Sequence, residues 1–427
     1  MNESIFKTEE TAPRIPSEIK ALFFALQLSD PDPTPLKRLS DEVWANVLAF
    51  CKTANLTLPL ALLPMEGFPD WVVERLTANL SDNALRFDRV KATYREVAEA
   101  LERAGVEHIV IKGITQSPDY VADPRLRAQS DIDIFCPPEN IEAAHGALTA
   151  IGYEPSPEKV SYALADHKAT LVRYGDWRWR GNAFDPEMPL SIELHFCLWN
   201  PRVSQIDIPE VELFWERRTR RELDDLSIPC LDPIHHLAYL TLHILRNLFL
   251  GEWIVHHVRE LALFLHSHSE DEEFWRLWNQ INSPSLGPFA AIAFYLARAW
   301  FGCRLHPLVA LEIDRLPATR KSWLECFSGS VLKIMFERNQ DAMWLHLTYL
   351  SSRSRRWRII KRNLIPARIA PISSISVQLR NKRLLPSVGR PLWQQYIFFL
   401  ISRSAGYVRA DSITLWRGLC WRLSRAF

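Results

Sequence analysis

The chain has 427 residues, of which 48% are hydrophobic and 24% charged, with a formal net charge of +1. This length allows two or three packed units rather than one, and the composition is typical of a soluble globular protein. Glycine is scarce at 14 residues, which argues against a glycine-rich sandwich or barrel. The near-zero total charge excludes a partner selected by the charge of the whole molecule. Any functional signal must therefore lie in local patterns.

Two further features bear on the compartment. The seven cysteines are far apart and include no CxxC pair, which suits free thiols in a reducing compartment and excludes a cysteine zinc knuckle. Residues 1–14 are polar and lack the order of a signal sequence. The longest apolar run near the other end, residues 396–401, is far shorter than the ~20 residues that a spanning helix needs. We therefore expect a cytoplasmic protein.

The predicted elements begin with a helical region over residues 1–105. One helix begins after Ser40, and a longer one runs from about residue 84 to 104 and ends at Gly105. The pattern then changes to strands at 106–113, 130–135, 169–174 and 190–196, with a helix at 138–152. These elements predict a small α/β core over residues 106–200.

Helical patterns return after the core. The first of these helices has Asp232 at its N-cap and Pro233 at its first position. Similar patterns follow and predict a helical domain over residues 201–345 and a basic C-terminal helical region over residues 346–427. The expected fold class is α+β, with a small mixed sheet and extensive flanking helical regions.

Two carboxylates lie two residues apart on the predicted strand at 130–135. Asp131 and Asp133 therefore point to one face, while Ile132 and Ile134 point to the core. Adjacent carboxylates repel each other unless a cation lies between them, and Mg²⁺ binds carboxylates together with substrate phosphates. The alternative is an exposed strand edge with two solvated acids, because so short a motif often occurs by accident.

Residues on both sides of this pair strengthen the metal-site interpretation. Lys112 and Gly113 end a strand and open a helix, where glycine lets backbone N–H groups approach phosphate and Thr115 adds a hydroxyl. Downstream, Glu193 is an acid among apolar strand residues, and a third carboxylate suits a two-metal or metal-plus-base site. His195 shares the face of Glu193, so we expect it beside the metal ligands.

This combination resembles the nucleotidyltransferase superfamily of the polymerase-beta type, which has a strand–glycine loop, then Asp-x-Asp, then a third acid on a later strand. It is most similar to bacterial uncharacterised nucleotidyltransferases with a KG…Y…R…SDIDI signature. The matching residues are Lys112-Gly113, Tyr120, Arg127 and the SDIDI of residues 130–134, followed by Gly152-Tyr153 and by the ELH of residues 193–195. The resemblance is specific from about residue 100 to 200 and looser in the flanking helices.

The resemblance implies a magnesium-dependent transferase. Asp131, Asp133 and Glu193 would hold one or two Mg²⁺ (or Mn²⁺) ions. A nucleoside triphosphate, with ATP favoured, would be bound by Lys112, Gly113, Thr115, Arg127 and Ser130. An acceptor hydroxyl of a small molecule, sugar or protein would attack the α-phosphorus, with Glu193 orienting or deprotonating it, and pyrophosphate would leave.

Two positions leave alternatives open. Ile114 follows the loop glycine, where the superfamily usually has Gly or Ser, so the hydroxyl comes one residue later at Thr115. Arg127 precedes the acids and either binds a phosphate or pairs with Asp131.

Five histidines fall in the predicted helices after residue 232, namely His235, His236, His243, His256 and His257. A metal site built from them is an alternative, but HxxxH and HExxH spacings are absent. We therefore expect them to be structural histidines in a helical core.

The C-terminal region is strongly basic. Residues 351–427 hold sixteen Lys and Arg against one acid, Asp411. Such a segment either packs against acidic residues elsewhere, contacts an anionic membrane peripherally, or binds RNA.

Three functions thus remain open. The first is the active transferase. The second is a non-catalytic nucleotide-binding or partner-binding protein that keeps the fold, and the third is an RNA-terminal nucleotidyltransferase. The three acids favour the first over the second, and the lack of a recognisable RNA module counts against the third. The sequence identifies neither the acceptor, nor the base, nor the oligomeric state.

Overall fold

The computed structural model describes residues 15–156, 166–282, 284–334, 336, 339–364 and 392–424. The chain divides into two units: Met1–Leu248 with Glu252–Pro317, and Phe249–Gly251 with Ala318–Phe427. The first unit contains the helices that precede the sheet, the whole sheet and the helices up to residue 317. The second begins at residue 318 and not near 346, because α13 (Ala318–Lys333) and α14 (Ala342–Leu347) pack in one series with the basic helix α15 (Arg353–Leu364).

Helices lead into the sheet, as predicted. They are α2 (Ser17–Ala25), η1 (Leu36–Arg38), α3 (Asp41–Ala54), α4 (Thr57–Ala61) and α5 (Asp70–Arg103). Helix α5 begins earlier than the predicted residue 84, because Asp70 follows Pro69 and the apolar spacing continues through Val72 and Leu76. Gly105 follows its end with a φ of +67°, in the left-handed region that terminates many helices.

The sheet of the first unit has seven strands in the order β3-β4-β5-β2-β1-β7-β6. They are β1 (Ile109–Val110), β2 (Asp131–Phe135), β3 (Glu154–Pro155), β4 (Leu171–Val172), β5 (Ser191–His195), β6 (Arg218–Leu223) and β7 (Leu226–Leu231). The pairs β2/β5 and β1/β7 are parallel, and the other pairs are antiparallel. Short elements join them: η2 (Gly113–Gln116), η3 (Pro124–Leu126), η4 (Pro138–Asn140), α6 (Ile141–Ala150), α7 (Pro201–Ser204) and η6 (Pro209–Arg217).

The sheet extends past residue 200, where the sequence pattern placed the end of the core. Strands β6 and β7 form a hairpin, and β7 joins the sheet because Val110 pairs with Cys230. The paired residues are far apart in the sequence, so no short-range pattern predicts this pairing. The mixed α+β class with flanking helices is confirmed.

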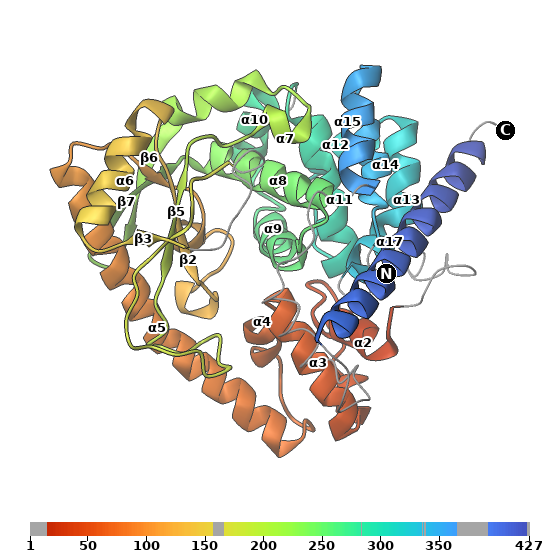
Figure 1. Cartoon of the computed structure of the whole chain (residues 1–427), viewed down its shortest axis with the longest axis horizontal. Coiled ribbons are helices and arrows are strands. Elements are labelled where there is room, and N and C mark those ends of the chain that lie inside the picture. The colour runs from red at the N-terminus through yellow and green to blue at the C-terminus, as the bar shows by residue number, and fades with distance from the viewer. Residues whose placement is uncertain are drawn as a thin grey trace. The chain divides into compact units, whose positions relative to one another are not determined.

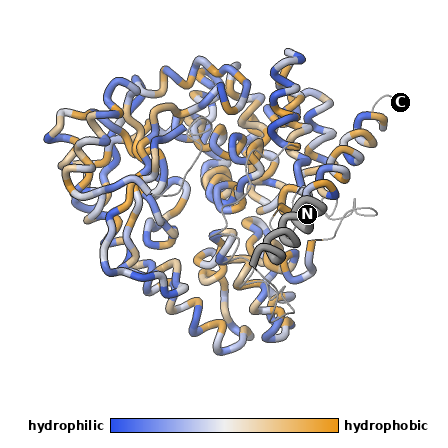
Figure 2. Tube along the Cα trace, in the orientation of Figure 1, coloured by the Kyte–Doolittle hydropathy of each residue, from blue (hydrophilic) through white to orange (hydrophobic). Residues whose placement is uncertain are grey.

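The two faces of the sheet differ in character. One face packs against α5 and α6, where Ile132, Ile134, Ile192 and Leu194 join a single buried cluster with Leu148 and other residues of those helices (Figure 1). Helix α5 alternates hydrophobic and hydrophilic residues along its length (Figure 2), because only one of its sides meets the sheet. The acids of β2 and β5 point away from this core, to the other face.

The rest of the first unit is helical. Its helices are α8 (Pro233–Leu250), α9 (Val255–Ser267), α10 (Glu272–Ile281), α11 (Gly287–Phe301) and α12 (Pro307–Asp314). Asp232 caps α8 as predicted, since its Oδ1 accepts the backbone N–H groups of Ile234 at 2.9 Å and His235 at 3.1 Å. The five histidines that the sequence pattern identified lie in α8 and α9 and are buried or half-buried, as expected for structural residues.

The second unit contains α13 (Ala318–Lys333), α14 (Ala342–Leu347), α15 (Arg353–Leu364) and α17 (Leu392–Leu423). Helix α15 carries most of the basic cluster, with Trp357 63% exposed and Ile359 buried. Residues 365–391 of the predicted basic region lie outside the described residues. Among the helices that are described, none combines the length and apolar character of a membrane span. Contact of this region with an anionic membrane or RNA stays a prediction.

The buried face of β2 gives a test of the packing. Ile132 is fully buried between the sheet and α5/α6, so Ile132→Ala should cost about 2–5 kcal/mol and Ile132→Val about 0.5–1.5 kcal/mol. Hydrogen–deuterium exchange of peptides that cover β2 and β5 measures this loss within the first unit. Equal protection in the two variants would contradict the packing.

Candidate active site

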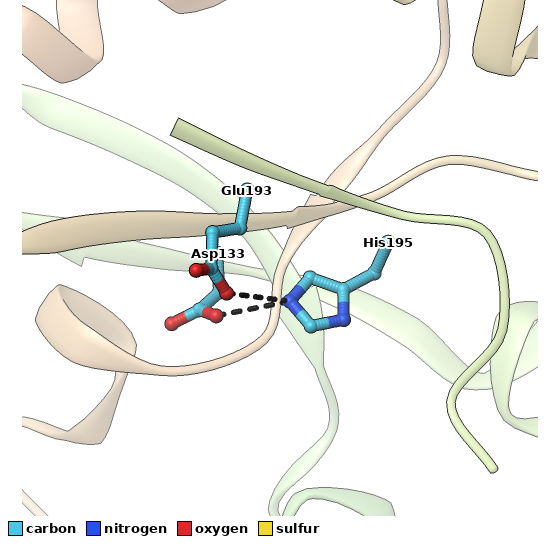
Figure 3. A group of neighbouring side chains, drawn as sticks. All are labelled: Asp133, Glu193 and His195. Carbon is cyan, nitrogen blue, oxygen red and sulfur yellow. Dashed lines mark hydrogen bonds and ion pairs between the residues drawn. The ribbon is translucent and has the colours of Figure 1, made fainter. Parts of the chain in front are cut away.

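The parallel pairing of β2 with β5 is in register and brings the predicted acids together. Asp133 pairs with Glu193, and Phe135 pairs with His195. One ligand atom from each of Asp133, Glu193 and His195 lies within 4.8 Å of the others (Figure 3). Asp131 lies two residues before Asp133 and shares its face. The face that the sequence predicted is thus assembled from two neighbouring strands.

Asp133 is the most buried of the three acids, at 5% exposure. Its Oδ1 accepts from the Lys112 Nζ at 2.8 Å and lies 3.0 Å from the His195 Nε2. Burial acts to raise the pKa of Asp133, but the charges and hydrogen bonds of Lys112 and His195 outweigh it and hold that pKa well below its usual range. Burial likewise opposes the charge on Lys112, yet Asp133 and Asp131 hold the pKa of Lys112 above its ordinary value. The Asp133 carboxylate is therefore ionised at neutral pH.

Asp131 and Glu193 have different surroundings. Burial and the neighbouring Asp133 raise the pKa of Asp131 to about 7, against the opposing effect of Lys112. Glu193 is more accessible than Asp133: its Oε1 accepts from the Thr170 hydroxyl at 3.3 Å, and its Oε2 lies 3.8 Å from the His167 Nε2. Three acids thus share a face on which the Lys112 ammonium contacts Asp133, so the face attracts a cation.

A chain of polar residues behind His195 was not predicted. The Nδ1 of His195 lies 4.0 Å from the Asp166 Oδ2, and Asp166 Oδ1 accepts from the Arg246 Nη2 at 2.9 Å. Asp166 is 3% exposed, and the positive charges of His195 and Arg246 hold its pKa below the usual value although burial opposes them. No periodic pattern surrounds Asp166 in the sequence, and Arg246 reads as one polar residue of a helix. Local sequence patterns therefore indicated neither residue as part of the site.

The glycine loop is held by packing. Gly113 has a φ of +70°, and a Cβ atom built there would lie 2.5 Å from the Gln129 Nε2. Gln129 in turn donates to the Asp131 carbonyl at 2.8 Å. The Thr115 hydroxyl, fully buried, donates to the Lys112 carbonyl at 3.2 Å. Both residues therefore shape the loop beside the acids, and their predicted phosphate contacts stay predictions.

Arg127 pairs with an acid that the sequence did not indicate. Its Nε donates to the Glu260 Oε1 on α9 at 2.8 Å, so its ion pair is with Glu260 and not with Asp131. Glu260 Oε2 also accepts from the Gln116 side chain at 3.0 Å. Glu260 thereby ties two parts of the connection between β1 and β2 to α9. Ser130, directly before Asp131, is exposed.

The residues present fit a divalent metal ion by their chemistry. Asp131, Asp133 and Glu193 offer the hard oxygen ligands that Mg²⁺ and Mn²⁺ prefer. His195 adds an imidazole that suits Mn²⁺ better than Mg²⁺. His195 thus lies within reach of the ligand atoms, as its strand position predicted.

The pKa of Asp131 predicts how metal binding depends on pH. The folded protein keeps a proton on Asp131 up to about pH 7, whereas an unfolded aspartate titrates near ~3.9. The metal-free fold therefore loses stability as the pH rises through this interval, since the unfolded chain releases that proton first. If a metal ion displaces this proton, its affinity should rise with pH by up to about tenfold per pH unit until about pH 7. Above pH 7 the affinity should no longer rise.

Calorimetric titration of metal-free protein with Mn²⁺ from about pH 5.5 to 8 measures this rise. In Asp131→Asn, the part of the rise due to this carboxyl should disappear. A wild-type affinity that does not change below pH 7 would contradict the assignment.

Gly113→Ala should destabilise the first unit by about 1–2 kcal/mol from the left-handed backbone alone, with a further cost from the contact with Gln129. Adding Gln129→Ala should remove the second part and leave the first. The matched control is Gly146→Ala in α6, where a Cβ meets nothing within 4 Å and should stabilise by about 0.5–1 kcal/mol. The measurement is the free energy of unfolding in urea; a neutral Gly113→Ala would refute the loop's dependence on glycine.

Comparison with known proteins places this site in a family. Comparisons with curated proteins and with solved structures find no significant match. The family model described as "Uncharacterised nucleotidyltransferase" matches residues 40–302. This span is well over half of the chain and includes α5, the whole sheet and the helices through α11. The chain therefore belongs to the uncharacterised nucleotidyltransferase family, and the acids of β2 and β5 lie within the matched region.

Proposed function

We propose that the protein is a Mg²⁺-dependent (or Mn²⁺-dependent) nucleotidyltransferase, which moves a nucleoside monophosphate from a nucleoside triphosphate, with ATP favoured, to a hydroxyl acceptor. The observation that carries this proposal is the in-register pairing of Asp133 with Glu193, with Asp131 on the same face. Membership of the nucleotidyltransferase family supports the same class of reaction. The acceptor is a small molecule, a sugar or a protein side chain.

Asp131, Asp133 and Glu193 would hold the metal ion. When bound, the ion would neutralise charge on the triphosphate and on the departing pyrophosphate. Lys112 keeps Asp133 ionised through their 2.8 Å contact. His195, ordered between Asp133 and Asp166, fixes the orientation of that carboxylate.

In the reaction, the acceptor oxygen forms a bond to the α-phosphorus as the bond from that phosphorus to the bridging oxygen of the β-phosphate breaks. Pyrophosphate leaves with the bonding electrons, and the hydroxyl proton passes to the Glu193 carboxylate. Glu193 suits this role because its side chain is more accessible than that of Asp133 and Thr170 donates to its Oε1. Correct placement of these groups supplies most of the rate enhancement.

Nucleotide contacts are assigned by position. Ser130 is exposed beside Asp131, so its hydroxyl is free to face a phosphate. Lys112, Gly113 and Thr115 lie at the opening of η2, and Arg127 is near enough to Asp131 to lower the pKa of that carboxyl. We assign the phosphates of the nucleoside triphosphate to the region around these residues.

The non-catalytic alternative predicts nucleotide binding without turnover, and the RNA-terminal alternative predicts label transfer to RNA. Incubation with each α-labelled nucleoside triphosphate, Mn²⁺ or Mg²⁺ and fractionated cell extract distinguishes them. Label in the metabolite or protein fraction supports the proposal, and label confined to RNA would replace it with the third function. Binding without any transfer would favour the second.

Asp133→Asn should reduce pyrophosphate release to background, because the buried oxygen that faces Lys112 and Glu193 loses its charge. Glu193→Gln should lower the rate by roughly 10²–10⁴-fold, the usual contribution of a general base. The control is Glu187→Gln, whose side chain is 73% exposed and lies on the loop that precedes β5. Pyrophosphate release is measured under saturating triphosphate. Undiminished release in Asp133→Asn would overturn the proposed mechanism.

A further inference from the structure

A cavity lies in the first unit, and Arg127 of the connection between β1 and β2 forms part of its wall. It has a volume of about 180 Å³ and is lined by α4 and its flanking residues, by residues 121–128 and by α9. Helices α4 and α9 lie close together in this unit (Figure 1). Most of its wall is aliphatic, including Leu58, Leu62, Leu126 and Leu263. A dry cavity of roughly 150 Å³ already accommodates benzene, so this one fits a ring or a short alkyl chain.

The cavity also contains a cationic group that lacks a counter-ion. Arg259 lines it, and its Nε is buried without a hydrogen-bond partner among the described residues. Over the described ranges Arg259 forms no ion pair with an acid. Burial lowers the pKa of Arg259 to about 10, with Glu260 opposing the shift, so the guanidinium stays charged at neutral pH.

The neighbouring charges do not neutralise Arg259. Glu260 is the nearest acid on the wall, but its two oxygens are taken by Arg127 at 2.8 Å and by Gln116 at 3.0 Å. His256, also on the wall, is uncharged because burial and His257 hold its pKa well below the usual value. The lining therefore carries two arginines and one glutamate, an excess of one positive charge in a mostly apolar cavity.

We propose that this cavity binds a small carboxylic acid, with its apolar body against the leucines and its carboxylate paired with Arg259. A carboxylate matches the single excess charge and the fork of the guanidinium. The small volume sets the size at about that of benzoate or hexanoate. The inference does not depend on the proposed transferase reaction, because it uses neither the strand acids nor a metal ion. Arg127, which we also assigned to the phosphates, enters only as the partner of Glu260.

The test uses the full chain without metal or nucleotide. Benzoate and hexanoate are compared with their uncharged counterparts benzamide and 1-hexanol by saturation-transfer difference NMR and by calorimetry. The two acids should bind at least roughly tenfold more tightly than the neutral compounds, as loss of one charge-assisted pair implies. In Arg259→Gln this preference should disappear.

Two further variants keep the result interpretable. Arg304→Gln removes the same charge from an arginine whose side chain is 59% exposed and should bind the acids as the wild type does. Leu62→Trp retains Arg259 but fills the mouth of the cavity at a position that is 51% exposed, so it should abolish binding of all four compounds even if Arg259→Gln does not fold.

Three outcomes would overturn the proposal. The first is equal affinity for benzoate and benzamide. The second is no binding of either acid up to ~10 mM, a very weak affinity. The third is tighter binding of phenyl phosphate than of benzoate, which would assign the cavity to a phosphate instead.

Discussion

The in-register parallel pairing of β2 with β5 is the constraint on which the candidate site depends. Parallel neighbours keep residues at equal heights on the same face, so Asp133 and Glu193 meet only in this register. A slip of one residue would turn Ile192 toward the acids and Glu193 toward α6. The buried isoleucines of both strands exclude that slip, because it would expose them and bury charge.

Long-range polar contacts then fix the irregular backbone around the strands. Backbone groups outside regular structure must still find hydrogen-bond partners when they are buried. Arg86 on α5 is 1% exposed and supplies several of them, donating to the carbonyls of Gln129, Asp185 and Met188. Glu260 on α9 holds the side chains of Arg127 and Gln116 in the connection between β1 and β2. Helix α5 thus covers the sheet and, through Arg86, also stabilises the irregular backbone around the strands.

The sequence predicted what short-range periodicity encodes. Alternation in residues 130–135 and 190–196 placed Asp131, Asp133, Glu193 and His195 on one face, and the structure assembles that face from β2 and β5. The α+β class and the cap at Asp232 also followed from local patterns. These features depend on residues only a few positions apart.

Other features depend on pairings between distant parts of the chain. Asp166 acquires its role only when Arg246, 80 residues later, reaches it. Glu260 looked like an ordinary helix acid, and its pairing with Arg127 spans 133 residues. Strand β7 joined the sheet beyond residue 200 for the same reason. Gly113 was predicted for phosphate, yet the structure also ties it to Gln129.

Helix α9 carries Arg259 and Glu260 at adjacent positions, about 100° apart around the helix axis. Both residues line the apolar cavity, and Glu260 also holds Arg127 and Gln116 of the connection between β1 and β2. The wall of this cavity comes from α4, residues 121–128 and α9, whereas the strand carboxylates come from β2 and β5. The proposed carboxylic-acid cavity and the strand acids therefore come from different segments, although Arg127 lies near both. Substitutions among the leucines would alter the proposed cavity and leave the strand acids unchanged.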